Sequence, residues 1–251
     1  MAKIRPVAKG QRHNYMQAVF FVLLICFSTY VLLQSPLFNV RNIQVVGRSE
    51  ISQQELVKLS GIVLGTNIFK LDLKTGQEKI SLLPAVKEVE LTRKFPSTII
   101  ISITERQPVA FLPLNKSFIE IDNEGIYLRQ GEINKKDIPI ITGFTIDEVK
   151  PGQKVSDEKV DIALMVIDQL PEKLVSQLSE IHIDQHNKII IYTINGIQGR
   201  LGLPTEIAQK GDMFVQVLNQ LDNGHMIDYI DITSFKTPVV KYYSTSEGIA
   251  S

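Results

Sequence analysis

A single apolar segment near the N-terminus constrains this chain most. Residues 15–34 read YMQAVFFVLLICFSTYVLLQ and contain no charged side chain. At a helical rise of about 1.5 Å per residue, roughly 20 such residues span about 30 Å, the thickness of a bilayer's hydrocarbon core. The segment is therefore predicted to be a transmembrane helix, and the rest of the 251-residue chain must fold on either side of it.

A cleaved signal peptide is the alternative, because it also begins with basic residues and an apolar run. The apolar run here is longer than the roughly 7–15 residues of a signal-peptide core. The sequence that follows, LQSPLF (33–38), contains no Ala-x-Ala-like cleavage site. An uncleaved anchor is therefore the favoured interpretation.

Basic residues on either side of the span predict its orientation. Four of them precede the span with no acidic residue among them: Lys3, Arg5, Lys9 and Arg12. Only Arg41 and Arg48 follow within about 15 residues. The positive-inside rule therefore places residues 1–14 in the cytoplasm as a basic tail, and residues after 34 outside it.

The charge balance of the remainder argues against a nucleic-acid partner. The chain has 27 basic and 27 acidic residues, so without the four basic residues of the tail, 23 basic residues face 27 acidic ones. The resulting charge of −4 gives no basic footprint for nucleic acid. Cys26 is the only cysteine, so an intrachain disulfide is excluded.

The region directly after the span has the pattern of a small mixed domain. Helix caps are offered by Ser49 and Ser52, and Gly61 offers a stop. Phe-Pro-Ser at 95–97 offers a turn between two strands. The predicted order is β-α-α-β-β, with strands over 40–47, 86–94 and 98–105, and helices from the caps to Gly61 and over 74–83.

The strand TIIISITE (98–105) is open to two interpretations. Its alternation places Ile99, Ile101 and Ile103 on one face, which suits a core strand beneath the two helices. Its polar face and its edge could equally be free to accept another chain by strand addition. The following ERQP (105–108) is predicted to be the joint between domains, because Pro108 ends the ladder.

The second half predicts further strands and two amphipathic helices. One helix is expected from Asp157 with Ser156 as its cap, and the other opens at Pro204, with Gly211 allowing close approach near its middle. The predicted strands lie within 117–128, 139–144, 180–203 and 227–233. The tail after Tyr243 is small and polar, and is predicted to be loose.

The sequence contains few candidate catalytic residues, and their pattern does not match a specific catalytic motif. His182 and His186 have the His-x-x-x-His spacing of some zinc sites, but they lie in a strand and turn context, which favours two surface histidines. Asp122, Glu124 and Glu132 are acids near one hairpin, where turns favour such residues for backbone reasons. No Gly-x-Ser-x-Gly or phosphate-binding loop motif is present, so the sequence does not point to an enzyme.

Several segments together resemble a known family. They are IQVVG (43–47), NIF (67–69), PAVKEVELTRKFP (84–96) and IISITERQPVA (100–110), followed more loosely by GRLGLP (199–204), Lys210 and DITSF (231–235). With a single anchor before a βααββ unit, they resemble the FtsQ/DivIB family of bacterial cell-division proteins. The resemblance implies an α+β fold: a transmembrane helix over 15–34, a POTRA domain over 38–106, a second α+β domain over 107–236 with an antiparallel sheet and two helices, and a largely flexible tail over 237–251.

The resemblance also implies a function. A member of this family would be a non-enzymatic scaffold in the cell membrane at the division septum, with single-span partners of FtsB/DivIC and FtsL type. It implies no cofactor, no metal, no nucleic acid and no small-molecule substrate. The alternatives are a transport-type POTRA protein, which would need several POTRA units or a β-barrel, and an extracytoplasmic cell-wall hydrolase, which would need polar groups converging in a pocket.

The resemblance places the partner site at the last strand of the second domain, where an FtsB/DivIC chain adds a strand. Ile230 and Ile232 are expected to face the core and to leave the backbone edge toward solvent. The expected partner-binding residues are Asp231, Thr233, Ser234, Phe235, Lys236, Tyr242 and Tyr243. In the alternative, Phe235 closes the core and the tyrosines are exposed by chance, since Pro238 limits how far a ladder can run.

Overall fold

The computed structural model describes residues 11–47, 50–133, 138–146, 148–220 and 227–243. The chain divides into two compact units. The first contains the residues up to Ser81 together with Glu88–Thr104, and the second contains Leu82–Lys87 together with the residues from Glu105 onward. Each unit buries its own apolar side chains and is described by itself.

Helix α1 (Gln11–Leu33) is the one helix among the described residues that is long and apolar enough to cross a membrane. Its apolar part, Tyr15–Leu33, has a mean hydropathy of 2.3, and none of it is buried inside the protein. Large side chains such as Phe20 and Phe27 are therefore exposed, as a lipid-facing helix requires. The predicted span is present as a helix of the required length and composition.

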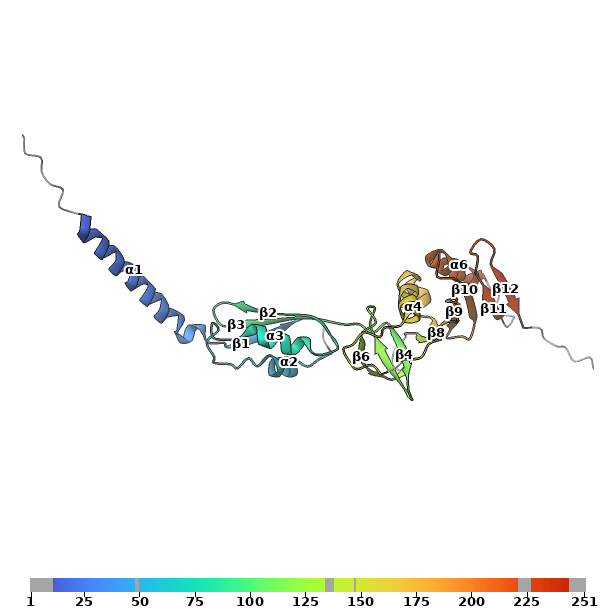
Figure 1. Ribbon diagram of the computed structural model, residues 1–251, viewed down its shortest axis with the longest axis horizontal. Helices are drawn as coiled ribbons and strands as arrows, with labels where there is room; N and C mark the ends of the chain where they lie inside the picture. Colours follow the sequence, from blue (N-terminus) through green and yellow to red (C-terminus); the bar gives the residue numbers. More distant parts are fainter. Residues whose placement is uncertain (1–10, 48–49, 134–137, 147, 221–226, 244–251) are drawn as a thin grey trace, which may run out of the picture. The chain divides into compact units, whose positions relative to one another are not determined.

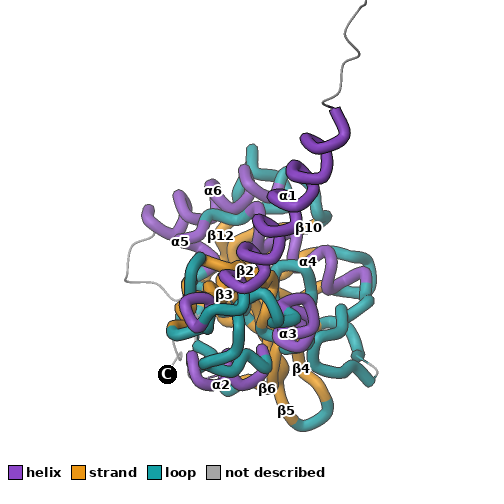
Figure 2. The backbone as a smooth tube through the Cα atoms, turned by 90° about the vertical axis from the view of Figure 1, so that its left-hand side faces the viewer, coloured by secondary structure: helices purple, strands orange, loops and turns teal. Residues whose placement is uncertain are grey.

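After α1, the described residues of the first unit form a strand, two helices and two more strands, in the predicted order. The elements are β1 (Asn42–Val46), α2 (Gln53–Ser60), α3 (Leu73–Ser81), β2 (Val86–Lys94) and β3 (Thr98–Glu105). Both helices lie on one face of a three-stranded sheet (Figures 1 and 2). Alternation along β3 buries Ile99, Ile101 and Ile103 against them, while the residues in between stay at least partly exposed.

Local signals fix both ends of α2. The Ser52 hydroxyl accepts a hydrogen bond from the Glu55 amide at 3.2 Å, which satisfies one of the free amides of the first turn. Gly61 ends the helix at a φ of 68°, a left-handed conformation that a side chain disfavours. The other expected cap, Ser49, lies outside the described residues.

The sheet order decides between the two interpretations of TIIISITE. The order is β1-β3-β2, so β3 lies in the middle and pairs with a strand on each side. A central strand has no free edge, so strand addition onto β3 is excluded and the core interpretation holds. The open edges of this sheet, within the described residues, belong to β1 and β2.

The second unit is built on a long sheet. In the part of the chain that the structure describes, it has nine strands, in the order β12-β11-β10-β9-β8-β7-β4-β5-β6. Their bounds are β4 (Ala110–Leu114), β5 (Ser117–Ile121), β6 (Tyr127–Gly131), β7 (Ile140–Thr142), β8 (Leu178–Ile183), β9 (Ile189–Thr193), β10 (Gln198–Gly202), β11 (Ile227–Asp231) and β12 (Val239–Tyr242).

The α+β class is confirmed, and one detail of the sheet is corrected. Strand pairs β4/β7, β7/β8 and β10/β11 are parallel, so the sheet is mixed rather than wholly antiparallel. The reason is the position of the helices in the chain. Parallel neighbours need a long crossover, and the helical segments between β7 and β8 and between β10 and β11 supply two of them.

The described residues of this unit form three helices: α4 (Glu158–Gln169), the short α5 (Glu172–Val175) and α6 (Ile207–Gln220). Figure 1 shows α4 and α6 beside the strands β8 to β10, and both helices bury apolar side chains in the same core as the sheet. The cap of α4 is Asp157, whose carboxylate accepts from the amides of Lys159 and Val160, and not Ser156 as expected. An aspartate also complements the helix dipole.

Gly211 lies at the predicted close approach in α6. A Cβ atom there would come within 2.7 Å of both the Leu170 side chain and the Pro171 ring. A leucine end can rotate away, but a proline ring cannot. The absence of a side chain at this position therefore lets α6 pack against the end of α4.

We expect Gly211→Ala to destabilise the second unit, although alanine is the better helix former by about 1 kcal/mol. Overpacking a tight contact costs about 1–3 kcal/mol, so the net loss should be about 1 kcal/mol, or about 2–4 °C in Tm. Thermal unfolding of the detergent-solubilised chain measures it. Gln216→Ala, at an exposed position of the same helix, is the control and should leave Tm unchanged. An increase in Tm for Gly211→Ala would contradict the close approach.

Candidate partner-docking edge

Strand β12 forms one end of the nine-stranded sheet, and β6 forms the other. The outer side of β6 is partly covered at its start, because the Tyr127 amide donates to the Gln153 carbonyl at 2.9 Å and the Gly152 amide donates to the Tyr127 carbonyl at 2.7 Å. The outer side of β12 has no strand neighbour in the described residues. β12 is therefore the more open end of the ladder.

Backbone pairing fixes the position of β12. It runs antiparallel to β11, with Asp231 opposite Val239 and Ile230 opposite Val240. Val240 packs against the core of the unit, so Val239 and Lys241 point to the opposite face by the two-residue period of a strand. An antiparallel edge strand directs about half of its backbone amides and carbonyls away from its neighbour, and this leaves a template for one more strand.

Side chains on β10, β11 and β12 hold this end of the sheet together. The Arg200 guanidinium lies 3.6 Å from the centre of the Tyr229 ring, and the Lys241 ammonium lies 5.4 Å from the same ring. The Lys241 ammonium also pairs with the Asp228 carboxylate at 3.1 Å. These contacts tie β10, β11 and β12 into one layer, so an added strand would meet an ordered edge.

Buried groups support the same strands from the helix side. The Phe214 side chain of α6 contacts Gly199 of β10, where a Cβ atom would come within 2.5 Å of the ring. Lys210, also on α6, is buried, and its ammonium donates to the Leu203 carbonyl at 2.9 Å. Burial lowers the pKa of Lys210. Its role here is to satisfy a carbonyl after β10, where the chain turns toward the helix.

The structure corrects where the predicted site has its free edge. Ile230 and Ile232 face the core as expected, since both are fully buried. The backbone of Asp231 is not at the edge, because β11 lies between β10 and β12. Thr233, Ser234 and Lys236 are exposed in the turn between β11 and β12.

The predicted aromatic residues divide into two groups. Phe235 is half-buried and packs against the core of the unit, which matches the alternative that it closes the core. Tyr242 and Tyr243 are exposed, on β12 and directly after it. Of the predicted site residues, these two therefore lie along the open edge.

Strand β12 itself was missed by the sequence analysis, which assigned 237–251 to a loose tail. The structure places residues 239–242 of that segment in the sheet. The signal in VVKYY is weak, because the strand follows Pro238 and its residues lie on a half-exposed edge without regular alternation. Two adjacent β-branched residues followed by aromatic ones were the only available indication.

Two of the three acidic residues considered for catalysis, Asp122 and Glu124, form part of a structural ion network. The Arg106 guanidinium bonds to the Asp122 carboxylate and, at 2.7 Å, to the Glu124 carboxylate. Lys87 also pairs with Glu124, at 2.9 Å. Hydrogen bonds from Arg106 and then Lys87 lower the pKa of Glu124 to about 2. A glycosidase acid needs a raised pKa, so Glu124 is unsuited to that role.

The histidine pair does not form a metal site in the structure. His182 lies on β8, where its Nδ1 atom is 2.8 Å from the Thr142 hydroxyl, and His186 lies in the turn that follows. The described residues contain no group of three or more His, Cys, Asp or Glu side chains placed to hold a metal ion. Both histidines lie in the hairpin formed by β8 and β9.

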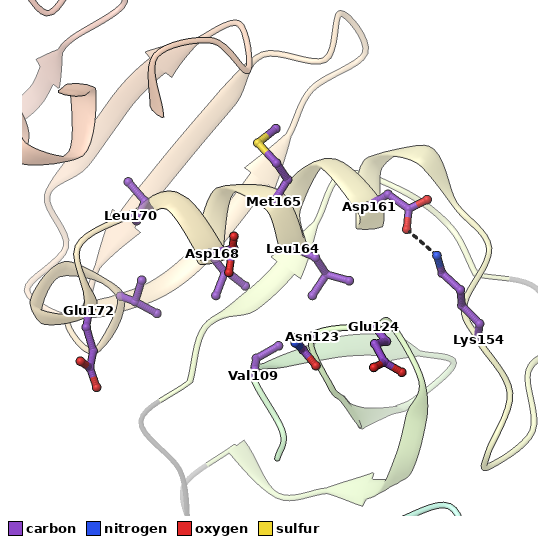
Figure 3. A pocket seen from close by; sticks show the side chains of 12 residues that line it. Val109, Asn123, Glu124, Lys154, Asp161, Leu164, Met165, Asp168, Leu170 and Glu172 are labelled. Atoms are coloured by element: carbon purple, nitrogen blue, oxygen red, sulfur yellow. Dashed lines mark ion pairs between the residues drawn. The ribbon is translucent and has the colours of Figure 1, made fainter. Parts of the chain in front are cut away.

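A groove of about 690 Å³ lies beside α4 (Figure 3). Its twelve lining residues include apolar side chains such as Leu164, and Asp161 on its rim pairs with Lys154 at 3.1 Å. None of the twelve is a histidine, cysteine or serine. The groove therefore offers no Ser–His or Cys–His pair.

The sequence matches two models of known domain families. The first, the POTRA domain of FtsQ type, matches residues 38–106. The second, the C-terminal region of the cell division protein FtsQ/DivIB, matches residues 110–233. The chain belongs to the FtsQ/DivIB family of bacterial cell-division proteins. The match to the second model ends before β12, so the proposal for the docking edge rests on the structure.

The chain is also similar to individual FtsQ and DivIB proteins. The chain is 29% identical to the cell division protein FtsQ of Syntrophotalea carbinolica, over 88% of this chain and 79% of that protein. It is also 29% identical to the cell division protein DivIB of Clostridium botulinum strain Loch Maree, over 93% of each chain. The solved extracytoplasmic domain of DivIB from Geobacillus stearothermophilus aligns with 18% identity and a TM-score of 0.34, over 48% of this chain and 98% of that domain.

The Arg106 network of this FtsQ/DivIB family member predicts a pH-dependent stability. The pKa of Glu124 is lower in the folded chain than the ordinary 4.5, so its contribution is present above about pH 4.5 and is lost as the pH falls toward about 2. We expect Glu124→Gln to lower Tm at neutral pH, with a difference from the wild type that shrinks on acidification. Thermal unfolding between about pH 7 and pH 3 measures it.

The control for that experiment is Glu148→Gln. Glu148 is exposed in the same unit and forms no ion pair in the described part of the chain. Its substitution should leave Tm unchanged across the pH range. A Glu124→Gln difference that stayed constant or grew on acidification would contradict the ion network.

Proposed function

We propose that the chain is a non-enzymatic, membrane-anchored scaffold of the division septum, which binds partners of FtsB/DivIC and FtsL type. Residues 1–14 would lie in the cytoplasm, α1 would cross the cell membrane, and both folded units would lie outside the cytoplasm. The four basic residues before the span support this orientation, because the positive-inside rule counts lysine and arginine close to the membrane.

The open edge of β12 is the observation that carries this proposal. A partner strand laid along β12 would extend the sheet through backbone hydrogen bonds, which give affinity with little demand on side-chain identity. Strand addition suits a scaffold, because it requires an ordered template and no chemistry. The ordered template is present in the β10, β11 and β12 layer.

Side chains beside the edge would give the interaction its specificity. Val239 is 56% exposed, Tyr242 45% and Tyr243 60%, and they lie along a single short strand and its end. Aromatic side chains are enriched among the residues that dominate interface energies, and truncating one often costs about 2 kcal/mol or more. We infer that Tyr242 and Tyr243 contact the partner, while Phe235 holds the turn against the core.

We expect Val239→Glu to weaken the recovery of the FtsB/DivIC-type partner by about tenfold or more, which corresponds to about 1.4 kcal/mol. A carboxylate on the edge strand would lose water when a partner strand docks, which costs binding free energy. Co-purification of the partner with the full chain from detergent-solubilised dividing cells measures the effect.

Ile194→Glu is the matched control, since Ile194 is also a β-branched residue, 63% exposed, in the turn between β9 and β10. It should leave recovery unchanged, and both variants should keep the wild-type Tm. Equal recovery by Val239→Glu and wild type would move the docking site away from β12.

A further inference from the structure

A cluster of apolar side chains lies where the first unit meets the end of α1. The Phe38 and Phe69 rings have centroids 5.2 Å apart, and Phe69 and Phe95 stack with centroids 5.3 Å apart. Phe69 is 43% exposed, Phe95 57% and the neighbouring Leu37 47%. Single exposed apolar residues are ordinary on a protein surface. Aromatic rings that contact one another and are also solvent-exposed form an apolar patch, and such a patch marks a site of interaction with another apolar surface.

Three separate segments supply the cluster. Phe38 ends the 3₁₀ helix η1 (Pro36–Phe38), Phe69 follows the loop after α2, and Phe95 lies in the turn between β2 and β3. The Ile68 amide donates to the Phe38 carbonyl at 2.8 Å. The Arg93 guanidinium donates to the Ile68 carbonyl, also at 2.8 Å. These bonds hold the three segments together as one surface at the α1 end of the sheet (Figure 1).

The cluster is fastened close to the last turn of α1. The Asn67 side-chain amide donates to the Leu33 carbonyl at 2.8 Å. The Ser35 amide donates to the Leu32 carbonyl at 3.0 Å, and Ser35 itself is extended, with a φ of −60° and a ψ of 146°, so η1 begins after a break in the helix. The bond from Asn67 places the loop that carries Phe69 beside the last residue of α1.

A loop beside the last residue of a membrane-spanning helix lies at the membrane interface. A bilayer is about 40–45 Å thick with its headgroups, and its hydrocarbon core is about 30 Å, so each headgroup layer is about 5–8 Å deep. With α1 spanning the core up to Leu33, the cluster would lie within or against that layer. Water-facing protein surface would begin only beyond it.

The charged residues around the cluster also suit a lipid interface. Arg41, Lys70 and Lys94 are exposed, and Arg93, on β2, donates to the Leu71 carbonyl at 2.6 Å. An acidic residue, Asp72, follows Lys70 in the chain. Its carboxylate accepts hydrogen bonds from Thr75 at the start of α3. Basic side chains around an apolar centre can reach lipid phosphates while their stems cover apolar surface.

We propose that Leu37, Phe38, Phe69 and Phe95 form a collar that inserts into the headgroup layer of the leaflet from which α1 emerges. This interaction is separate from partner docking at β12, and it rests on α1 spanning the membrane. Two attachments, the helix and the collar, would hold the first unit against the bilayer, whereas a linker alone would let it swing. The collar contacts lipid, and not another protein.

The chain contains no tryptophan, so single substitutions give unambiguous fluorescence reporters. The full chain is reconstituted in nanodiscs of phosphatidylcholine whose acyl chains carry bromine near the glycerol end. We expect the emission of Phe95→Trp to be blue-shifted and reduced roughly twofold relative to nanodiscs of unbrominated lipid, because the ring lies at the headgroup and acyl boundary. Phe69→Trp should behave in the same way, which guards against failure of a single variant to fold.

Two further reporters make the outcomes distinguishable. Phe27→Trp, on α1, should be quenched if the helix spans the bilayer at all. Val46→Trp should be unquenched, because Val46 is exposed at the other end of β1, about 13 Å beyond the start of that strand. Quenching of Phe27→Trp without quenching of Phe69→Trp and Phe95→Trp would overturn the collar and leave the anchor intact. A blue shift of Phe95→Trp only after a partner protein is added would also overturn it, since the surface would then belong to a protein.

Discussion

Backbone pairing in the long sheet determines where the second unit can accept another chain. Each internal strand has both sides occupied, so the amides and carbonyls available to a partner are confined to the two ends of the ladder. The loop at 152–155 covers the start of β6, whereas β12 has a strand on one side only in the described residues. The ion pair between Lys241 and Asp228 and the ring of Tyr229 then order the open end. The chain thus has an open strand edge near its C-terminus and, near its N-terminus, an apolar helix long enough to cross a membrane, an arrangement that suits a scaffold.

Much of the first unit could be predicted because its signals are local. The strands over 86–94 and 98–105 have the predicted bounds, since alternation and a turn define them within a short stretch of chain. In the second unit, strand β4 was missed because AFLPL has a continuous apolar run and Pro113, with no alternation to read. The parallel pairs were missed for a different reason. Which strands become neighbours depends on where the helices pack, and this is a tertiary property that a local pattern does not contain.

The candidate site likewise has features that the sequence predicts and features that depend on tertiary packing. Burial of Ile230 and Ile232 followed from the two-residue period, but the identity of the edge did not, because β12 is short and half-exposed on both faces. Pairing of Arg106 with Asp122 joins residues that are distant in the sequence, and it explains why acids that looked available for catalysis are structural. The aromatic collar also depends on three separate segments meeting, so no single segment of the sequence could have indicated it.

Amide hydrogen exchange tests the docking edge most directly, because it reports on the backbone that strand addition would cover. The full chain would be measured alone and in its complex with the FtsB/DivIC-type partner. We predict that the amides of residues 239–242 exchange more slowly in the complex, and that those of residues 129–131 on β6 are unchanged. Slower exchange on β6, or on the open edges of β1 or β2, with unchanged exchange on β12 would contradict docking at this edge.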